Sequence, residues 1–151
     1  MMREPPFLAM LLVLASFAVL TGASAGPAPA WRVDNGGIPT ALTAVPGDPV
    51  NGRKVVIAPK LGNCLACHAM PIPEEPDHGQ VASSLSGIGS RLDAAKLRLR
   101  IVDPKRVTPD TMMPSFFRTE GFHRVLKDFE GRTILTAQEV EDVVAYLLTL
   151  K

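Results

Sequence analysis

Two cysteines and a histidine stand at a spacing that constrains this chain more than any other feature. Residues 64–68 read Cys-Leu-Ala-Cys-His, and Cys-x-x-Cys-His is the spacing by which a polypeptide attaches a c-type haem. The two thiols form thioethers with vinyl groups on one edge of the porphyrin, and the adjacent imidazole stands under the iron. The pattern therefore predicts one covalent haem c per chain, bound through Cys64, Cys67 and His68.

A thioredoxin-like dithiol and half of a zinc site are the alternatives for a Cys-x-x-Cys pair. The dithiol motif belongs to a βαβ context, which the sequence does not indicate. A zinc site needs a second pair of ligands, and Cys64 and Cys67 are the only cysteines in the chain. Haem attachment is favoured over both alternatives.

The N-terminus has the pattern of an export signal. Arg3 precedes an apolar run over residues 7–20, and residues 21–25 (TGASA) supply the small side chains that signal peptidase requires. The run has about 14 residues, fewer than the roughly 20 that span a bilayer, so a retained anchor is the weaker alternative. We expect a signal peptide over residues 1–25, cleavage, and a periplasmic mature protein without a membrane span.

Charge excludes two classes of partner. The net charge is +1 at pH 7, and loss of residues 1–25 leaves it unchanged because Arg3 and Glu4 cancel. A nearly neutral chain suggests neither nucleic acid nor an anionic membrane as a partner.

Residues 26–47 are rich in proline and lack periodicity, which predicts an extended N-terminal arm. We expect Trp31 to be its only large anchor and to pack on the domain rather than on a partner. The remaining residues, 48–151, have the length of one small domain, and a bound haem would provide part of its core.

Two helices are indicated in the first part of this domain. Asp48-Pro49 is typical of an N-cap followed by proline at the first helical position, and Pro59 ends that helix. A second helix is expected over residues 93–102, capped by its aspartate and stopped at Asp103-Pro104. Between them, residues 70–77 are too rich in proline for a helix or a central strand.

A third helix follows residues 136–139 (TAQE), which fit a capping box. Its apolar stripe is expected to be core packing rather than a cofactor contact. The stripe consists of Val140, Val143, Val144, Leu147 and Leu148. Since neither alternating strands nor an internal repeat is present, we predict a mainly α, class I cytochrome c-like domain with long loops.

The second axial ligand of the iron must reach the face of the ring opposite His68. The candidates are Met70, Met112, Met113, His78 and His123. Met70 is only two residues away, about 7 Å of extended chain, which is too short to pass round a porphyrin. Neighbours in an extended segment point to opposite sides, and Pro114 keeps Met113 extended. This favours Met113 and leaves Met112 as the alternative, while both histidines are expected to be ordinary surface residues.

Further blocks of sequence extend beyond the haem motif. They are residues 62–68 (GNCLACH), 85–91 (LSGIGSR), 97–105 (LRLRIVDPK), 109–114 (PDTMMP), 118–121 (RTEG) and 138–147 (QEVEDVVAYL). Together they resemble SoxX, the monohaem subunit of the SoxXA sulfur-oxidation cytochromes, over most of the chain after residue 48. The family places its methionine ligand just before a proline, which matches Met113.

The resemblance has one visible departure. Relatives of this fold usually have Gly-Pro before the Ser-Leu block, and this chain has Ala82-Ser83. In cytochromes c the proline carbonyl commonly orients the ligating histidine, so the resemblance transfers that role to the backbone of Ser83.

The resemblance implies a function in sulfur oxidation. SoxXA joins thiosulfate oxidatively to a cysteine of the SoxYZ carrier protein, and two electrons pass through haem to a soluble acceptor cytochrome. Because Cys64 and Cys67 are expected to be thioethers, the nucleophile should lie on a SoxA partner. No residue of this chain is then catalytic, and the chain is the electron-accepting subunit of a heterodimer.

Two other functions stay open, a free-standing periplasmic electron shuttle and a haem-binding sensor or structural subunit. Charges of both signs alternate over residues 118–130, whereas shuttles often carry a docking patch of one sign, so a dedicated partner is favoured. A firmly bound Met113 argues against the sensor. The same stretch and its flank contain Phe116, Phe117, Phe122 and Phe129, of which some are expected in the core and others against SoxA.

Overall fold

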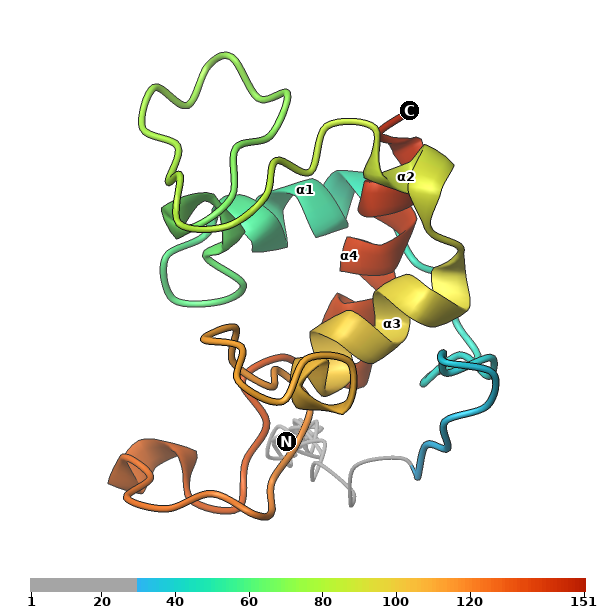
Figure 1. The fold of residues 1–151 in the computed structure, drawn as a ribbon, viewed down its shortest axis with the longest axis vertical. Coiled ribbons are helices and arrows are strands. Elements are labelled where there is room, and N and C mark those ends of the chain that lie inside the picture. Colours follow the sequence, from blue (N-terminus) through green and yellow to red (C-terminus); the bar gives the residue numbers. More distant parts are fainter. Residues whose placement is uncertain (1–29) are drawn as a thin grey trace, which may run out of the picture.

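The computed structural model describes residues 30–151, so the expected signal peptide and the first residues of the arm lie outside the described part. Figure 1 shows helices and long loops, with α1 and α4 crossing and α3 alongside α4. The helices are α1 (Pro49–Ile57), α2 (Ile88–Arg91), α3 (Ala94–Val102) and α4 (Ala137–Thr149), and the 3₁₀ turns are η1 (Cys64–Ala66), η2 (Pro104–Arg106) and η3 (Lys127–Phe129). Within residues 30–151, β-pairing is limited to one isolated bridge, and no helix is both long and apolar enough to cross a membrane. The expected mainly α architecture is confirmed.

The helices begin where their capping residues predict. The carboxylate of Asp48 accepts from the N–H of Val50 at the start of α1, and that of Asp93 accepts from the N–H of Lys96 at the start of α3. At α4 the Thr136 hydroxyl and the Glu139 side chain complete the capping box. In each case a side chain satisfies a backbone donor that the helix itself leaves open.

α1 and α4 approach each other closely at Gly52. A Cβ atom at this position would lie 1.9 Å from the carbonyl oxygen of Asp142, so only glycine allows the two backbones to meet. The buried carboxylate of Asp142 joins the same helices, because it accepts from the N–H of Asp48 at 2.8 Å and from Asn51 Nδ2 at 2.6 Å. Burial acts to raise the pKa of Asp142, but these hydrogen bonds and one from Gln138 hold it below its usual range.

A buried ion pair joins α3 to α4 and fixes the N-terminal arm. Arg98 Nε and Nη2 donate to the two carboxylate oxygens of Glu141 at 2.7 and 2.8 Å. Arg98 Nη1 also donates to the carbonyl of Ile38, and Glu141 accepts from the N–H of Leu42. Arg98 and Glu141 are both buried. The two backbone contacts therefore provide additional hydrogen-bond partners for the guanidinium and the carboxylate, which a buried ion pair requires.

The arm therefore has more anchors than the sequence suggested. Trp31 is partly buried against the core, as expected. The expectation that it is the only large anchor was wrong, because Ile38 and Leu42 are buried more deeply than Trp31. A tight turn at Asp34–Gly37 directs the chain toward these two positions.

We expect Gly52→Ala to destabilise the protein severely, by about 3 kcal/mol or more, because the added methyl group overlaps a backbone oxygen that cannot move alone. Lys54→Ala is the matched control, since Lys54 is an exposed residue of the same helix, and its effect should stay within about 0.5 kcal/mol. Denaturant unfolding of both variants measures the difference. Equal stability of the two variants would contradict the close approach at Gly52.

Candidate haem-binding site

The Cys-x-x-Cys-His segment forms a helical turn, as its spacing predicts. The turn is η1, and Asn63 enters it with the left-handed backbone φ of 46°. The N–H of His68 donates to the carbonyl of Cys64 at 2.9 Å. Cys64 and His68 are half-buried and Cys67 is exposed. The two thiols and the imidazole therefore lie near the protein surface.

The loop that follows packs on the backbone of this turn. The N–H of Gly79 donates to the carbonyl of Leu65 at 2.7 Å, and the N–H of Ala82 donates to that of Cys67 at 3.0 Å. A Cβ atom at Gly79 would lie 2.0 Å from the carbonyl oxygen of Ala66. Glycine is therefore required where the loop crosses the turn.

This loop brings a backbone acceptor to the imidazole. His68 Nδ1 lies 2.7 Å from the carbonyl oxygen of Ser83. A carbonyl only accepts, so Nδ1–H donates to Ser83 and the other ring nitrogen, Nε2, is left as the basic one. The contact that the SoxX resemblance transferred to Ser83 is thus present, although Ser83 stands where proline is usual.

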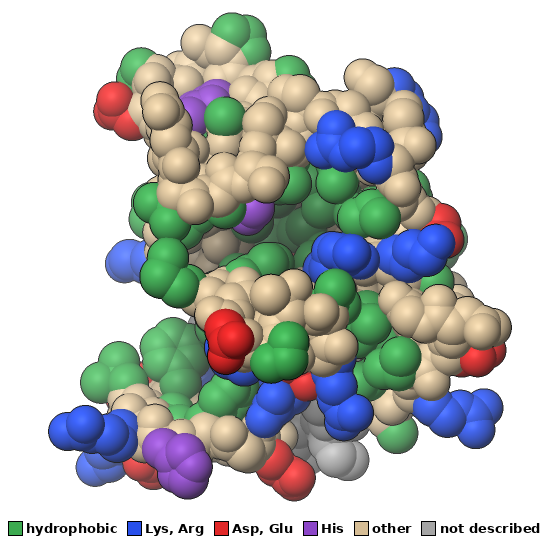
Figure 2. Space-filling view, viewed as in Figure 1, with side chains coloured by type: hydrophobic (Ala, Val, Ile, Leu, Met, Phe, Trp, Pro, Cys, Tyr) green, Lys and Arg blue, Asp and Glu red, His purple; other side chains and the backbone are tan. Residues whose placement is uncertain are grey.

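Two adjoining cavities, of about 230 and 480 Å³, open beside the imidazole. Both are lined by Gly62, Cys64, His68, Met113 and Phe116. Cys67 lines the larger cavity, and the smaller one is walled by Leu85, Ile88, Leu92, Leu97, Ile101, Leu135, Val143 and Leu147. Figure 2 shows the corresponding hollow between two parts of the molecule, with hydrophobic side chains inside it. An apolar wall with an imidazole, a thioether and two thiols in it fits a haem.

The apolar stripe of α4 contributes to the cavity as well as to the core. Val143 and Leu147 are core residues and also line the smaller cavity. The expectation that the stripe is core packing rather than a cofactor contact was therefore incomplete. Helical spacing identifies the buried face of α4, but not what lies against each position along it.

The two neighbouring methionines differ in their surroundings. Met113 lines both cavities, whereas Met112 lines only the larger one and is 80% exposed. The N–H of Met113 donates to Thr111 Oγ1 at 3.2 Å. Met113 is thus the more enclosed of the two, although both methionines line the larger cavity.

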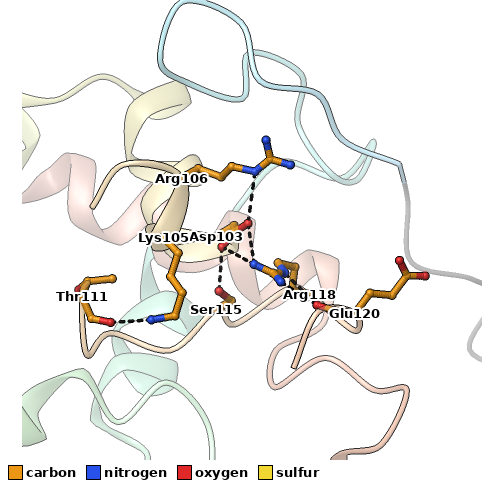
Figure 3. A network of polar contacts seen from close by, with 7 residues as sticks. All are labelled: Asp103, Lys105, Arg106, Thr111, Ser115, Arg118 and Glu120. Atoms are coloured by element: carbon orange, nitrogen blue, oxygen red, sulfur yellow. Dashed lines mark hydrogen bonds and ion pairs between the residues drawn. The ribbon is translucent and has the colours of Figure 1, made fainter. Parts of the chain in front are cut away.

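A polar network centred on Asp103 holds the methionine segment in place (Figure 3). The fully buried carboxylate of Asp103 accepts from Ser115 Oγ at 2.9 Å and from Arg118 Nη1 at 3.1 Å. On the other side of the two methionines, Lys105 Nζ donates to the carbonyl of Thr111 at 2.7 Å. The chain is therefore fixed both before and after Met113.

His78 was expected to be an ordinary surface histidine, and the structure corrects this. Its Nδ1 accepts from the N–H of Met70 at 3.3 Å, and its Nε2 is buried without a hydrogen-bond partner among the described residues. Neither His78 nor Met70 lines the two cavities, in contrast to His68. His123 is exposed, as expected.

Burial raises the pKa of the Cys64 thiol to about 12, because a thiolate loses its hydration in an apolar environment. At neutral pH this thiol is protonated and is a poor nucleophile. Its surroundings suit a thioether better than a reactive thiolate.

Comparison with known proteins agrees with this geometry. The family model for cytochrome c matches residues 50–151, and the chain belongs to the cytochrome c family, whose members bind haem c covalently and transfer electrons.

Among solved structures, the chain is similar to a chain of the crystal structure of SoxXA from P. pantotrophus, with 36% sequence identity and a TM-score of 0.75. The match covers 80% of this chain and 94% of that chain. Within the cytochromes c, it is a SoxX-like cytochrome. No curated protein sequence matches it significantly.

Proposed function

We propose that this chain is the electron-accepting subunit of a periplasmic SoxXA-type complex and carries one haem c. The observation that carries the proposal is the meeting of His68 and Met113 in the wall of one apolar cavity beside Cys64, in a chain similar to one of SoxXA. Haem c, when bound, supplies the exchange of one electron at a time. The protein's part is to hold the ligands, to set the exposure of the haem and to dock the partner.

Cys64 and Cys67 form the two thioethers, and His68 is the first axial ligand. The hydrogen bond from Nδ1 to the Ser83 carbonyl supports this assignment. It selects the tautomer in which Nε2 is available to the iron, fixes the plane of the ring and makes the imidazole a stronger donor.

Met113 is the second axial ligand. A thioether is a neutral ligand and raises the reduction potential relative to a second imidazole. Such a potential suits a subunit that receives electrons from sulfur oxidation. Because a thioether binds iron weakly, its position must be fixed by the protein, and the hydrogen bonds of Thr111 and Ser115 on either side supply this.

The sulfur chemistry takes place outside this chain. A bond forms between the sulfane sulfur of thiosulfate and a cysteine sulfur of the SoxYZ carrier, the thiol proton leaves, and two electrons are released in succession through the haem to a soluble acceptor. The reactive cysteine of the complex lies on the SoxA partner, since thioethers at Cys64 and Cys67 leave no free thiol in this chain.

The partner surface lies next to the methionine segment. Phe122, Leu126 and Phe129 are exposed apolar residues, and we call them the 122–129 surface. Phe122 and Phe129 line a groove that also contains Met112 and Met113. Charges of both signs alternate along residues 118–130, but the charged residues that line this groove are all basic, so the charge pattern does not by itself favour a dedicated partner over a shuttle. The basic residues are Lys60, Lys105, Arg118 and Arg132. Phe116 and Phe117, in contrast, are buried in the core.

The first test concerns covalent attachment. The intact mass of the mature protein should exceed its polypeptide mass by one haem that survives acid and organic extraction. Cys64→Ala and Cys67→Ala should each lose one of the two thioethers and so weaken attachment. Extraction of the pigment from the unmodified protein, or a mass increase of two haems, would contradict the proposal.

The second test distinguishes the two methionines. Methionine ligation gives oxidised cytochromes c a weak near-infrared absorption band. Met113→Ala should abolish this band and lower the reduction potential. Met112→Ala is the matched control and should leave both unchanged. The reverse result would assign the ligand to Met112, and a band that survives in both variants would exclude both residues.

The third test separates a subunit from a shuttle. The chain and a SoxA-like protein should form a complex at sub-micromolar concentration, and turnover of thiosulfate with SoxYZ should require both. Leu126→Asp should weaken the complex at least tenfold, about 1.4 kcal/mol. Val50→Asp is the control, because Val50 on α1 is 65% exposed and Leu126 is 67% exposed. Full activity of the chain alone, or no association, would establish the shuttle instead.

A further inference from the structure

One arginine contacts both the 122–129 surface and the carboxylate that anchors the methionine segment. Arg118 Nη1 donates to both carboxylate oxygens of Asp103, at 3.1 Å each. Its guanidinium carbon lies 4.9 Å from the centre of the Phe122 ring, within the range of a cation–π contact. Arg118 and Phe122 line the same groove as Met113. Arg118 therefore links the proposed partner surface with the segment of the proposed ligand.

The inner end of this link is buried. Asp103 is 1% exposed and accepts from Ser115 Oγ at 2.9 Å. Ser115 is itself buried and follows Met113 by two residues. Figure 3 shows Ser115 and Arg118 both directed at the Asp103 carboxylate. A shift of the guanidinium therefore acts on a carboxylate to which the methionine segment is bonded.

The outer end of the link is accessible. Phe122 is 39% exposed, and the Arg118 side chain is 26% exposed. Arg118 Nε and Nη2 donate to the carbonyl of Glu120, and a Cβ atom at Gly121, where φ is 75°, would collide with Nη2. Because the chain turns tightly round the guanidinium, a partner that packs on Phe122 also covers the exposed part of Arg118. Exclusion of water there strengthens the charge-assisted hydrogen bonds of Arg118.

We propose that Arg118 is a positioning residue through which binding of the partner subunit strengthens the ligation of iron by Met113. The inference rests on the proposed function, because it requires both the haem and a partner on the 122–129 surface. A thioether ligand favours the reduced state of the haem, so firmer ligation raises the reduction potential in the complex. By thermodynamic reciprocity, the reduced chain then binds the partner more tightly than the oxidised chain by the same factor.

The test is the reduction potential of this haem in the holoprotein, measured alone and with saturating SoxA-like partner. We expect the potential of the parent to rise on binding by the equivalent of about fivefold in affinity, about 40 mV at 59 mV per tenfold. Arg118→Gln should abolish this rise. In the free holoprotein it should also weaken the near-infrared band, and Arg118→Lys should restore the band in part because lysine keeps the charge beside Asp103.

Arg132→Gln is the matched control. Arg132 is exposed and lines the same groove, so this variant removes the same charge from the same surface without touching the Asp103 network. Its near-infrared band should equal that of the parent, and its potential should rise on binding as that of the parent does. The partner is the same throughout, so a difference between the variants arises in this chain. An equal loss of the rise in both variants would overturn the inference, because the effect would then be one of charge alone.

Phe122→Leu provides a second variant, which keeps the ion pair with Asp103 even if Arg118→Gln fails to fold. It should retain the near-infrared band of the free protein and reduce the rise in potential on binding. A parent that binds its partner without any rise, or an undiminished rise in Phe122→Leu, would overturn this inference alone. Absence of binding, or a haem that Met113 does not ligate, would overturn the proposed function.

Discussion

The close approach of α1 to α4 at Gly52 is the constraint on which the rest of the structure depends. α1 leads into the Cys64 turn, and the N–H of Gly62 donates back to the carbonyl of Val55, so the turn is fixed relative to α1. α4 carries Val143 on the wall of the haem cavity. The distance between the haem attachment turn and that wall is therefore set by how closely two backbones meet, and any side chain at Gly52 changes it.

The sequence predicted the three longer helices because their signals are local. A capping residue and its target lie within three residues of each other, as at Asp93 and Lys96. The anchoring of the arm could not be read in this way. The backbone N–H of Leu42 finds its acceptor, Glu141, 99 residues away, and no periodicity over residues 26–47 indicates this contact. Long-range polar partners are invisible to a pattern that is read in short windows.

In the candidate site too, the features with local signals could be predicted from the sequence and those that depend on long-range contacts could not. The turn from Cys64 to His68 follows from five residues, and the preference for Met113 over Met112 as the proposed ligand rests on the proline after it. The loop crossing at Gly79 and the buried Nε2 of His78 do not, because both depend on which backbone atoms the loop happens to meet. The contact with Ser83 was available only through resemblance to a family, since a serine carries no signal for this role.

The Asp103 network connects the methionine segment with the 122–129 surface. Arg118 donates to Asp103 and also to the carbonyl of Glu120 at 2.8 Å, and its guanidinium lies 4.9 Å from the centre of the Phe122 ring. Asp103 in turn holds Ser115, two residues after Met113. A displacement of Phe122 would therefore reach, through Arg118, the same carboxylate that holds the methionine segment. Because that carboxylate is fully buried and Arg118 is the closer of its two arginine partners, at 3.1 Å against 3.6 Å for Arg106, loss of Arg118 would weaken the compensation of a buried charge.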